Sequence, residues 1–165
     1  MKRLATVVLA VAALALGGTS ALAANGGATI EEDPVVFVLT SADCQNLPPG
    51  TTVTGTGTQK SITTVRTDNN GITTIANNTT AQGTAIDQAG NTYVFNYANN
   101  FRISNSASTP GVFSGRMTDS FSLAGNGPAR LSNGFQGIFT TDFLTFATID
   151  ELNSRGNPLE GCDPL

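Results

Sequence analysis

The chain of 165 residues is long enough for one domain, and its charge balance excludes several function classes. It has 8 basic residues (Lys and Arg) against 12 acidic ones, and it contains no His. We expect such an acidic surface to bind neither nucleic acid nor anionic membranes. The lack of His also excludes Ser-His-Asp and Cys-His catalytic systems and His-ligated zinc.

The first 23 residues are typical of a signal peptide. Lys2 and Arg3 form a positive head, Leu4 to Leu16 is an apolar run, and Ala21-Leu22-Ala23 supplies small residues for cleavage. The run is too short to span a bilayer and no later segment is apolar enough, so we expect no membrane span in the mature chain. The alternative is a retained anchor. The mature protein is therefore predicted to be secreted (extracellular or periplasmic), with 6 basic residues (8 minus Lys2 and Arg3) against 12 acidic ones.

The mature chain is predicted to contain a flexible lead-in, residues 24–33, and one domain, residues 34–165. Pro34 precedes the apolar run Val35 to Leu39, which predicts either a strand buried on both faces or an edge strand. Residues 40–50 end in Pro-Pro-Gly and are expected to form a loop.

Alternating strands joined by glycine turns follow this loop. Threonines alternate with Val53, Gly55 and Gly57, and glycines inside a strand indicate a bend or a close approach of backbones. Asp68 to Gly71 and Asp87 to Gly90 share an Asp-x-x-Gly spacing that predicts hairpin turns with left-handed glycines. A calcium loop at Asp68 is less favoured because the distal Glu of such loops is missing.

The longest clean alternation runs from Asp87 to Ser104 and predicts a strand with one aromatic face. Only Asn99 interrupts the apolar parity, whose members are Tyr93, Phe95, Tyr97, Phe101 and Ile103. The row is interpreted as a core, with the lining of a partly open pocket as the alternative.

The remaining segments complete an all-β pattern. Apolar residues alternate from Phe113 to Leu123 and from Leu131 to Phe139, and Phe143 to Ile149 is a last β-prone segment. No segment of the mature chain has a convincing helical pattern. We therefore expect an antiparallel up-and-down barrel of roughly eight strands, with a β-sandwich as the alternative.

Two cysteines remain in the exported chain. Cys44 and Cys162 are predicted to form a disulfide that joins the start of the domain to its end. Free or metal-binding thiols are the alternative, but no His is present as a further ligand. We expect no metal site and no cofactor.

Asp119 is the most informative carboxylate, because it lies on the apolar parity between Met117 and Phe121. An inward carboxylate can bind a ligand or act in acid–base chemistry. The alternatives are a β-bulge, a strand end or a structural hydrogen bond to the backbone. Asp142 lies in a similar local sequence and could form an acid pair with Asp119 for glycoside hydrolysis, although it also fits a hairpin turn.

The segment from Gly83 to Tyr97 resembles a loose group of small exported bacterial β-domain proteins. The shared features are a signal peptide, Gly55-Thr56-Gly57, the turn Thr67 to Gly71, the hairpin Asp87 to Tyr93 and the ending Cys162-Asp163-Pro164. The resemblance implies an exported all-β domain and supplies no catalytic residue.

Three functional hypotheses follow. The first is a secreted, non-enzymatic β-domain that binds a small apolar or aromatic ligand, or a partner. Its candidate binding residues are Tyr93, Phe95, Tyr97, Phe101 and Asp119. The second is an extracellular structural or surface-associated protein without a ligand. The third is a carboxylate-dependent hydrolase or isomerase that uses Asp119. The sequence does not predict the oligomeric state.

Overall fold

The computed structural model describes residues 27–144, 147–155, 162 and 164–165. The predicted signal peptide, residues 1–23, lies outside the described residues. Nowhere in the described residues is there a helix with the length and apolarity that a membrane crossing requires.

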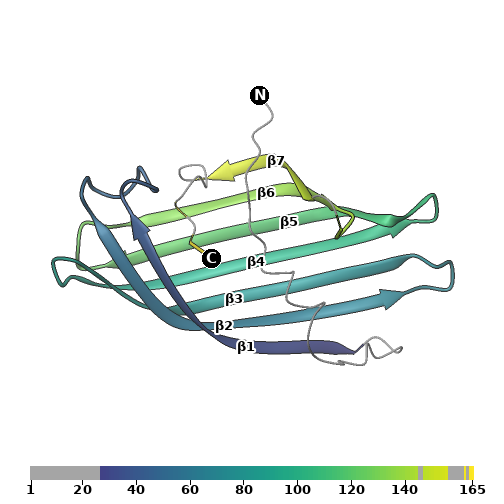
Figure 1. Cartoon of the computed structure of the whole chain (residues 1–165), viewed down its shortest axis with the longest axis horizontal. Coiled ribbons are helices and arrows are strands. Elements are labelled where there is room, and N and C mark those ends of the chain that lie inside the picture. The colour runs from purple at the N-terminus through teal and green to yellow at the C-terminus, as the bar shows by residue number, and fades with distance from the viewer. Residues whose placement is uncertain (1–26, 145–146, 156–161, 163) are drawn as a thin grey trace.

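Seven long strands form one antiparallel sheet in which each strand lies beside the next one along the chain (Figure 1). Their bounds are β1 (Ala28–Thr40), β2 (Thr52–Thr67), β3 (Thr73–Asp87), β4 (Thr92–Ser106), β5 (Thr109–Gly125), β6 (Leu131–Thr141) and β7 (Ala147–Arg155). The prediction of an all-β, antiparallel up-and-down fold is confirmed.

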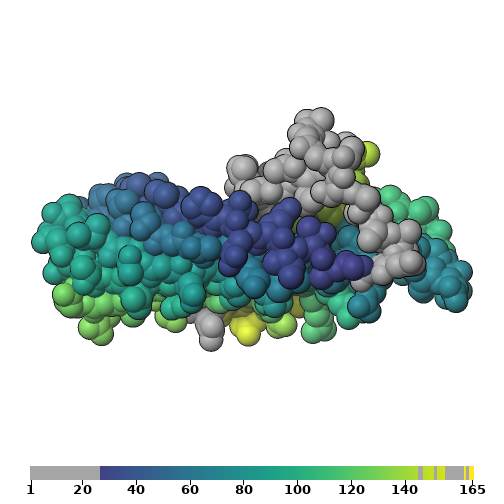
Figure 2. Space-filling model, turned by 90° about the horizontal axis from the view of Figure 1, so that it is seen from below, coloured from purple at the N-terminus to yellow at the C-terminus, as the bar shows by residue number. Residues whose placement is uncertain are grey.

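The sheet is not closed, so the prediction of a barrel is wrong. β1 pairs with β2, β7 pairs with β6, and no pairing in the described sheet joins β1 to β7. The alternative of a β-sandwich is also wrong, because the seven strands belong to one sheet. Figure 2 looks onto the β1 edge and shows the atoms of β1 at the surface. The sheet bends over its own inner face instead of closing edge to edge.

Two strand bounds differ from those expected. β1 begins at Ala28, inside the expected lead-in, because residues from Ala28 onward pair with β2 as far as Thr64. Pro34 lies within this strand, which is tolerated because β1 is an edge. β7 begins at Ala147, later than the expected start at Phe143, whose φ of 61° is incompatible with a strand.

Both Asp-x-x-Gly segments form the hairpin turns expected from the sequence. Gly71 and Gly90 have φ of 78° and 85°, in the left-handed region that glycine favours. In the first turn, Asp68 Oδ1 accepts hydrogen bonds from the backbone amides of Asn70 and Ile72. The carboxylate of Asp68 therefore stabilises the turn, in agreement with the hairpin interpretation.

Bare glycines on β2 and β3 allow the sheet to bend onto its aromatic residues. Phe37 of β1 lies over Gly55, where any Cβ would overlap the ring. Phe95 of β4 lies in the same way over Gly57 and Gly83. β1 and β2 bend sharply part-way along their length (Figure 1), as the glycine pattern predicted.

The rings of Phe37, Phe95 and Phe121 form the centre of the main core. The Phe37 centroid lies 5.0 Å from that of Phe95 and 5.8 Å from that of Phe121, and both contacts are edge-to-face. Such contacts are favourable beyond the area that they bury. Because Phe37 belongs to β1 while the other rings belong to β4 and β5, this cluster holds the bent sheet together.

The disulfide between Cys44 and Cys162 is present, as predicted, and the alternative of free thiols is wrong. Cys162 is buried, and its carbonyl accepts a hydrogen bond of 3.0 Å from Asn133 Nδ2 on β6. Leu165 packs against the main core. The end of the chain thus lies against the inner face of the sheet, next to the β1–β2 loop that carries Cys44.

A second apolar cluster covers the opposite end of the inner face. Ile103, Met117 and Phe139 are buried there. Half-buried residues pack around them: Ile75, Phe101, Phe113, Phe135 and Ile149. The polar residues between the two clusters form the candidate site described below.

The disulfide is expected to contribute substantially to stability, because it closes a loop over a sequence separation of 118 residues. We expect the double substitution Cys44→Ser and Cys162→Ser to lower the free energy of unfolding by about 2–5 kcal/mol. Urea unfolding followed by circular dichroism measures this change. An unchanged midpoint would show that the tail is held without the disulfide.

The glycine contact predicts a second stability effect. A Cβ at Gly83 would overlap the Thr56 carbonyl oxygen and lie 2.7 Å from the Phe95 ring, whereas one at Gly111 meets nothing within 4 Å. We expect Gly83→Ala to lower the free energy of unfolding by about 1–3 kcal/mol and Gly111→Ala to change it by less than about 0.5 kcal/mol. Equal urea midpoints for the two variants would contradict the proposed close packing.

Candidate functional site

Three of the aromatic residues expected to bind a ligand, Tyr93, Phe95 and Tyr97, are packed inside the main core. Tyr93 is 2% exposed and Phe95 is 1% exposed, and Phe95 contacts the rings of Phe37 and Phe121. This packing agrees with the interpretation of the row as core. A ligand role for Tyr93 and Phe95 stays a prediction, and it requires the core to open.

The Tyr93 hydroxyl stabilises the neighbouring hairpin turn. It donates a hydrogen bond of 2.8 Å to Asp87 Oδ2, which also accepts one from the Asn91 side chain. The backbone amides of Ala89 and Asn91 donate to Asp87 Oδ1. Burial and the bond to Asp87 raise the pKa of Tyr93. We interpret this buried pair as structural.

These hydrogen bonds lower the pKa of Asp87 below its ordinary value of 3.8. The largest cause is the bond from the Asn91 side chain; burial opposes it, and the Tyr93 hydroxyl and the backbone amides of Asn91 and Ala89 add to it. The stabilisation is therefore complete above this ordinary, unfolded-state pKa and is lost as the pH falls through the folded pKa.

Substitution of Asp87 tests this arrangement. We expect Asp87→Asn to be less stable than the wild type at neutral pH, with a difference that shrinks as the pH falls below about 4. Urea unfolding at a series of pH values measures the difference. Tyr93→Phe is the matched comparison, because it removes one donor and keeps the carboxylate. The free energy of unfolding that this variant loses should shrink in the same pH range. A constant difference for Asp87→Asn would contradict the assignment.

Asp119 points to the inner face, as predicted, between Asn99 on β4 and Phe135 on β6. Its Oδ2 accepts hydrogen bonds from the Tyr97 hydroxyl at 3.0 Å and from Asn99 Nδ2 at 2.6 Å. Its Oδ1 is buried and has no hydrogen-bond partner among the described residues. The β4–β5 register is continuous here, so the alternatives of a β-bulge and a strand end are wrong.

A network of amides and hydroxyls continues the polar region onto β2 and β3. Asn77 Nδ2 donates to Ser61 Oγ at 2.8 Å and to Thr63 Oγ1 at 2.9 Å. Thr79 donates to Asn77 Oδ1 and pairs in register with Asn99. We call the whole set the inner polar belt, and its members are Ser61, Thr63, Asn77, Thr79, Tyr97, Asn99 and Asp119.

Sequence reasoning identified Asp119 and Tyr97 but not the amides of the belt. Asn99 was visible only as an interruption of an aromatic row. Asn77 lies on β3 opposite Phe101, and no local pattern indicated that it faces the same surface. Interruptions of an apolar parity on neighbouring strands are the sequence feature that could have found the belt.

The belt does not support glycoside hydrolysis by Asp119 and Asp142. Asp142 follows Thr141, which pairs with Phe113, six positions from Asp119 on β5 (119 minus 113). At about 3.3 Å per residue this places the two acids roughly 20 Å apart, beyond the ~5–10 Å that such pairs use. Within the described residues no group of three potential metal ligands occurs.

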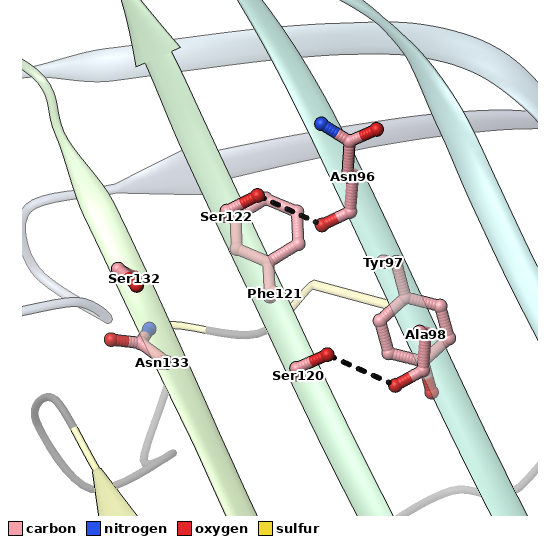
Figure 3. A pocket seen from close by; sticks show the side chains of 8 residues that line it. All are labelled: Asn96, Tyr97, Ala98, Ser120, Phe121, Ser122, Ser132 and Asn133. Carbon is pink, nitrogen blue, oxygen red and sulfur yellow. Dashed lines mark hydrogen bonds between the residues drawn. The ribbon is translucent and has the colours of Figure 1, made fainter.

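Shallow hollows lie on the outer face of the sheet. The hollow in Figure 3 has a volume of about 130 Å³ and is lined mainly by small polar residues of β4, β5 and β6. Ser120 and Ser122 donate to the backbone carbonyls of Ala98 and Asn96. These hydroxyls are used within the sheet, and the hollow offers no charged group.

Comparison with family models, curated proteins and solved structures finds no match for this chain. The resemblance to exported bacterial β-domain proteins therefore stays a prediction.

Proposed function

We propose that the protein is an exported, non-enzymatic binding domain whose ligand lies over the inner polar belt. The ligand is a small molecule with an apolar or aromatic body and one hydrogen-bond donor. The observation that carries this proposal is the buried Oδ1 of Asp119, which has no hydrogen-bond partner in the part of the chain that the structure describes. The disulfide between Cys44 and Cys162 supports export to an oxidising compartment.

The carboxylate of Asp119 is preorganised for a donor. Tyr97 and Asn99 both donate to Oδ2, so the second oxygen is held in place and is the free acceptor. A buried polar atom without a partner costs about 1–3 kcal/mol, and more when it is charged. A hydroxyl or amine of a ligand that donates to Oδ1 would remove this cost.

Half-buried rings beside Asp119 provide the apolar contact. Phe135 is its register partner on β6, and Phe101 lies two positions beyond Asn99 on β4. Both rings pack against the second apolar cluster but keep part of their surface exposed. The proposed contacts are thus Phe101, Phe135, Tyr97 and Asp119, with Tyr93 and Phe95 supporting them from the core.

The filled aromatic core favours a second candidate, an extracellular structural or surface-associated protein. The rings of Phe37, Phe95 and Phe121 occupy the interior that a small ligand would otherwise use. The edges β1 and β7 are also unpaired within the described sheet, and such edges can pair with other chains. A hydrolase or isomerase has less support, because the groups bonded to Asp119 are a tyrosine and an amide rather than a second acid.

Substitution of Asp119 by Asn tests the binding proposal. The amide oxygen can still accept from Tyr97 and Asn99, while its NH₂ group replaces the free acceptor. We expect the fold to be retained and the affinity for ligands with a donor to fall about tenfold or more. The probes are phenol, benzyl alcohol, benzylamine and toluene, measured by chemical shift changes in NMR. Toluene lacks a donor and should respond equally weakly in both proteins.

Asp150→Asn is the matched control, because Asp150 is an exposed carboxylate on β7. It should leave every probe response unchanged. Native mass spectrometry of protein purified from the exported fraction adds a second readout. Equal responses of the wild type and Asp119→Asn to all donors, with no co-purified molecule, would favour the structural candidate.

A further inference from the structure

The basic residues of strands β2 to β6 lie on the outer face of the sheet. Lys60 and Arg66 on β2, Arg102 on β4 and Arg116 on β5 are exposed and share the outward parity. The strands β2 to β6 are fully described, and their carboxylates, Asp87 and Asp119, lie on the inner face. The outer face of β2 to β6 therefore presents cations and no acid, and the neighbouring acid on β1 is Glu32, the register partner of Lys60.

Two of these cations face each other directly. Arg102 and Arg116 are register partners on β4 and β5, so their side chains leave the same face about 5 Å apart at their Cα atoms. Like charges in this position destabilise a sheet. Neither guanidinium forms an ion pair with a described residue. The acid in the same cross-strand row is Asp150, the register partner of Ile138. Asp150 lies two strand spacings, about 10 Å, from Arg116.

A hollow adjoins the arginine pair. It has a volume of about 410 Å³ and extends over β2 to β5. The amides of Asn78 and Asn100 and the hydroxyl of Thr118 line it beside the two arginines. Ile62 and Ala76 contribute apolar surface. The hollow thus combines two cations and several neutral hydrogen-bonding groups with a surface that is mainly apolar.

We propose that Arg102 and Arg116 together bind a phosphate monoester, with the rest of the ligand over the hollow. A phosphate dianion neutralises both guanidinium groups, and its oxygens accept from two donor forks at once. A monocarboxylate would leave one positive charge uncompensated. The amides and Thr118 can then bond hydroxyl groups of the esterified molecule.

The acidity of the whole protein is compatible with one bound phosphate. At physiological salt, interactions between exposed charges are largely screened beyond about 8 Å. The local cations therefore dominate for a single anionic group. A polyanion would extend over the acidic parts of the surface, which is why the site fits one phosphate ester and not a nucleic acid.

The test compares the wild type with the double variant Arg102→Gln and Arg116→Gln. Arg130→Gln is the matched control, since Arg130 is exposed in the β5–β6 connection and does not line the hollow. Titration calorimetry with inorganic phosphate and glucose 6-phosphate measures affinity. We expect the affinity for both probes to fall about tenfold or more in the double variant and less than about twofold in Arg130→Gln.

Thermal unfolding gives a readout that a nonspecific charge effect would not move in the same way. Without phosphate, the double variant should unfold at a higher temperature than the wild type, because the repulsion is gone. Added phosphate should raise the unfolding temperature of the wild type and of Arg130→Gln, but not that of the double variant.

The source of the phosphate is distinguished by a second arm. Cosedimentation with phosphatidylcholine vesicles that contain phosphatidic acid, lost in the double variant, assigns a lipid headgroup. Binding of glucose 6-phosphate alone assigns a soluble ester. No binding of either probe, or an equal loss in Arg130→Gln, overturns the proposal. Neither result bears on the inner polar belt, which the Asp119→Asn variant tests separately.

Discussion

The contact of Phe37 with the glycine surface of β2 is the constraint on which the rest of the fold depends. Phe37 can lie over Gly55 only because no side chain occupies that position, and it then reaches Phe95 and Phe121 across the inner face. These contacts join the first strand, β1, to the fourth and fifth strands, β4 and β5. The sheet bends at β1 and β2, and its interior is filled without edge-to-edge closure.

The aromatic cluster also determines where polar groups can lie. It fills one end of the inner face, and the cluster around Ile103 fills the other, so the strands must cross a region that neither cluster covers. Polar groups in that region are hydrogen-bonded across strands, as Asn77 is with Ser61. One carboxylate oxygen of Asp119, Oδ2, is hydrogen-bonded across strands in the same way, whereas Oδ1 has no partner among the described residues. The position of the belt is therefore a consequence of how the two cores are spaced.

Local patterns predicted the strands, the two Asp-x-x-Gly turns, the disulfide and the inward direction of Asp119. Each of these depends on residues that are close in sequence or, for the cysteines, on residue type alone. That the sheet stays open instead of forming a barrel was not predictable. The outcome depends on where Phe37 packs, and the partners of Phe37 lie on β4 and β5. The partners Tyr97 and Asn99 of Asp119 required the β4–β5 register, which no single segment encodes.

The period of two along each strand separates two chemistries on one sheet. Residue 119 faces inward and offers an acceptor, whereas residue 116 on the same strand faces outward and offers a cation. Pairing with β4 brings Tyr97 and Asn99 beside Asp119, and it brings Arg102 beside Arg116. A shift of one residue in this register would exchange the faces of every side chain. The same backbone hydrogen bonds that hold the sheet thus keep a carboxylate away from the arginine pair and leave both groups without a described counterion.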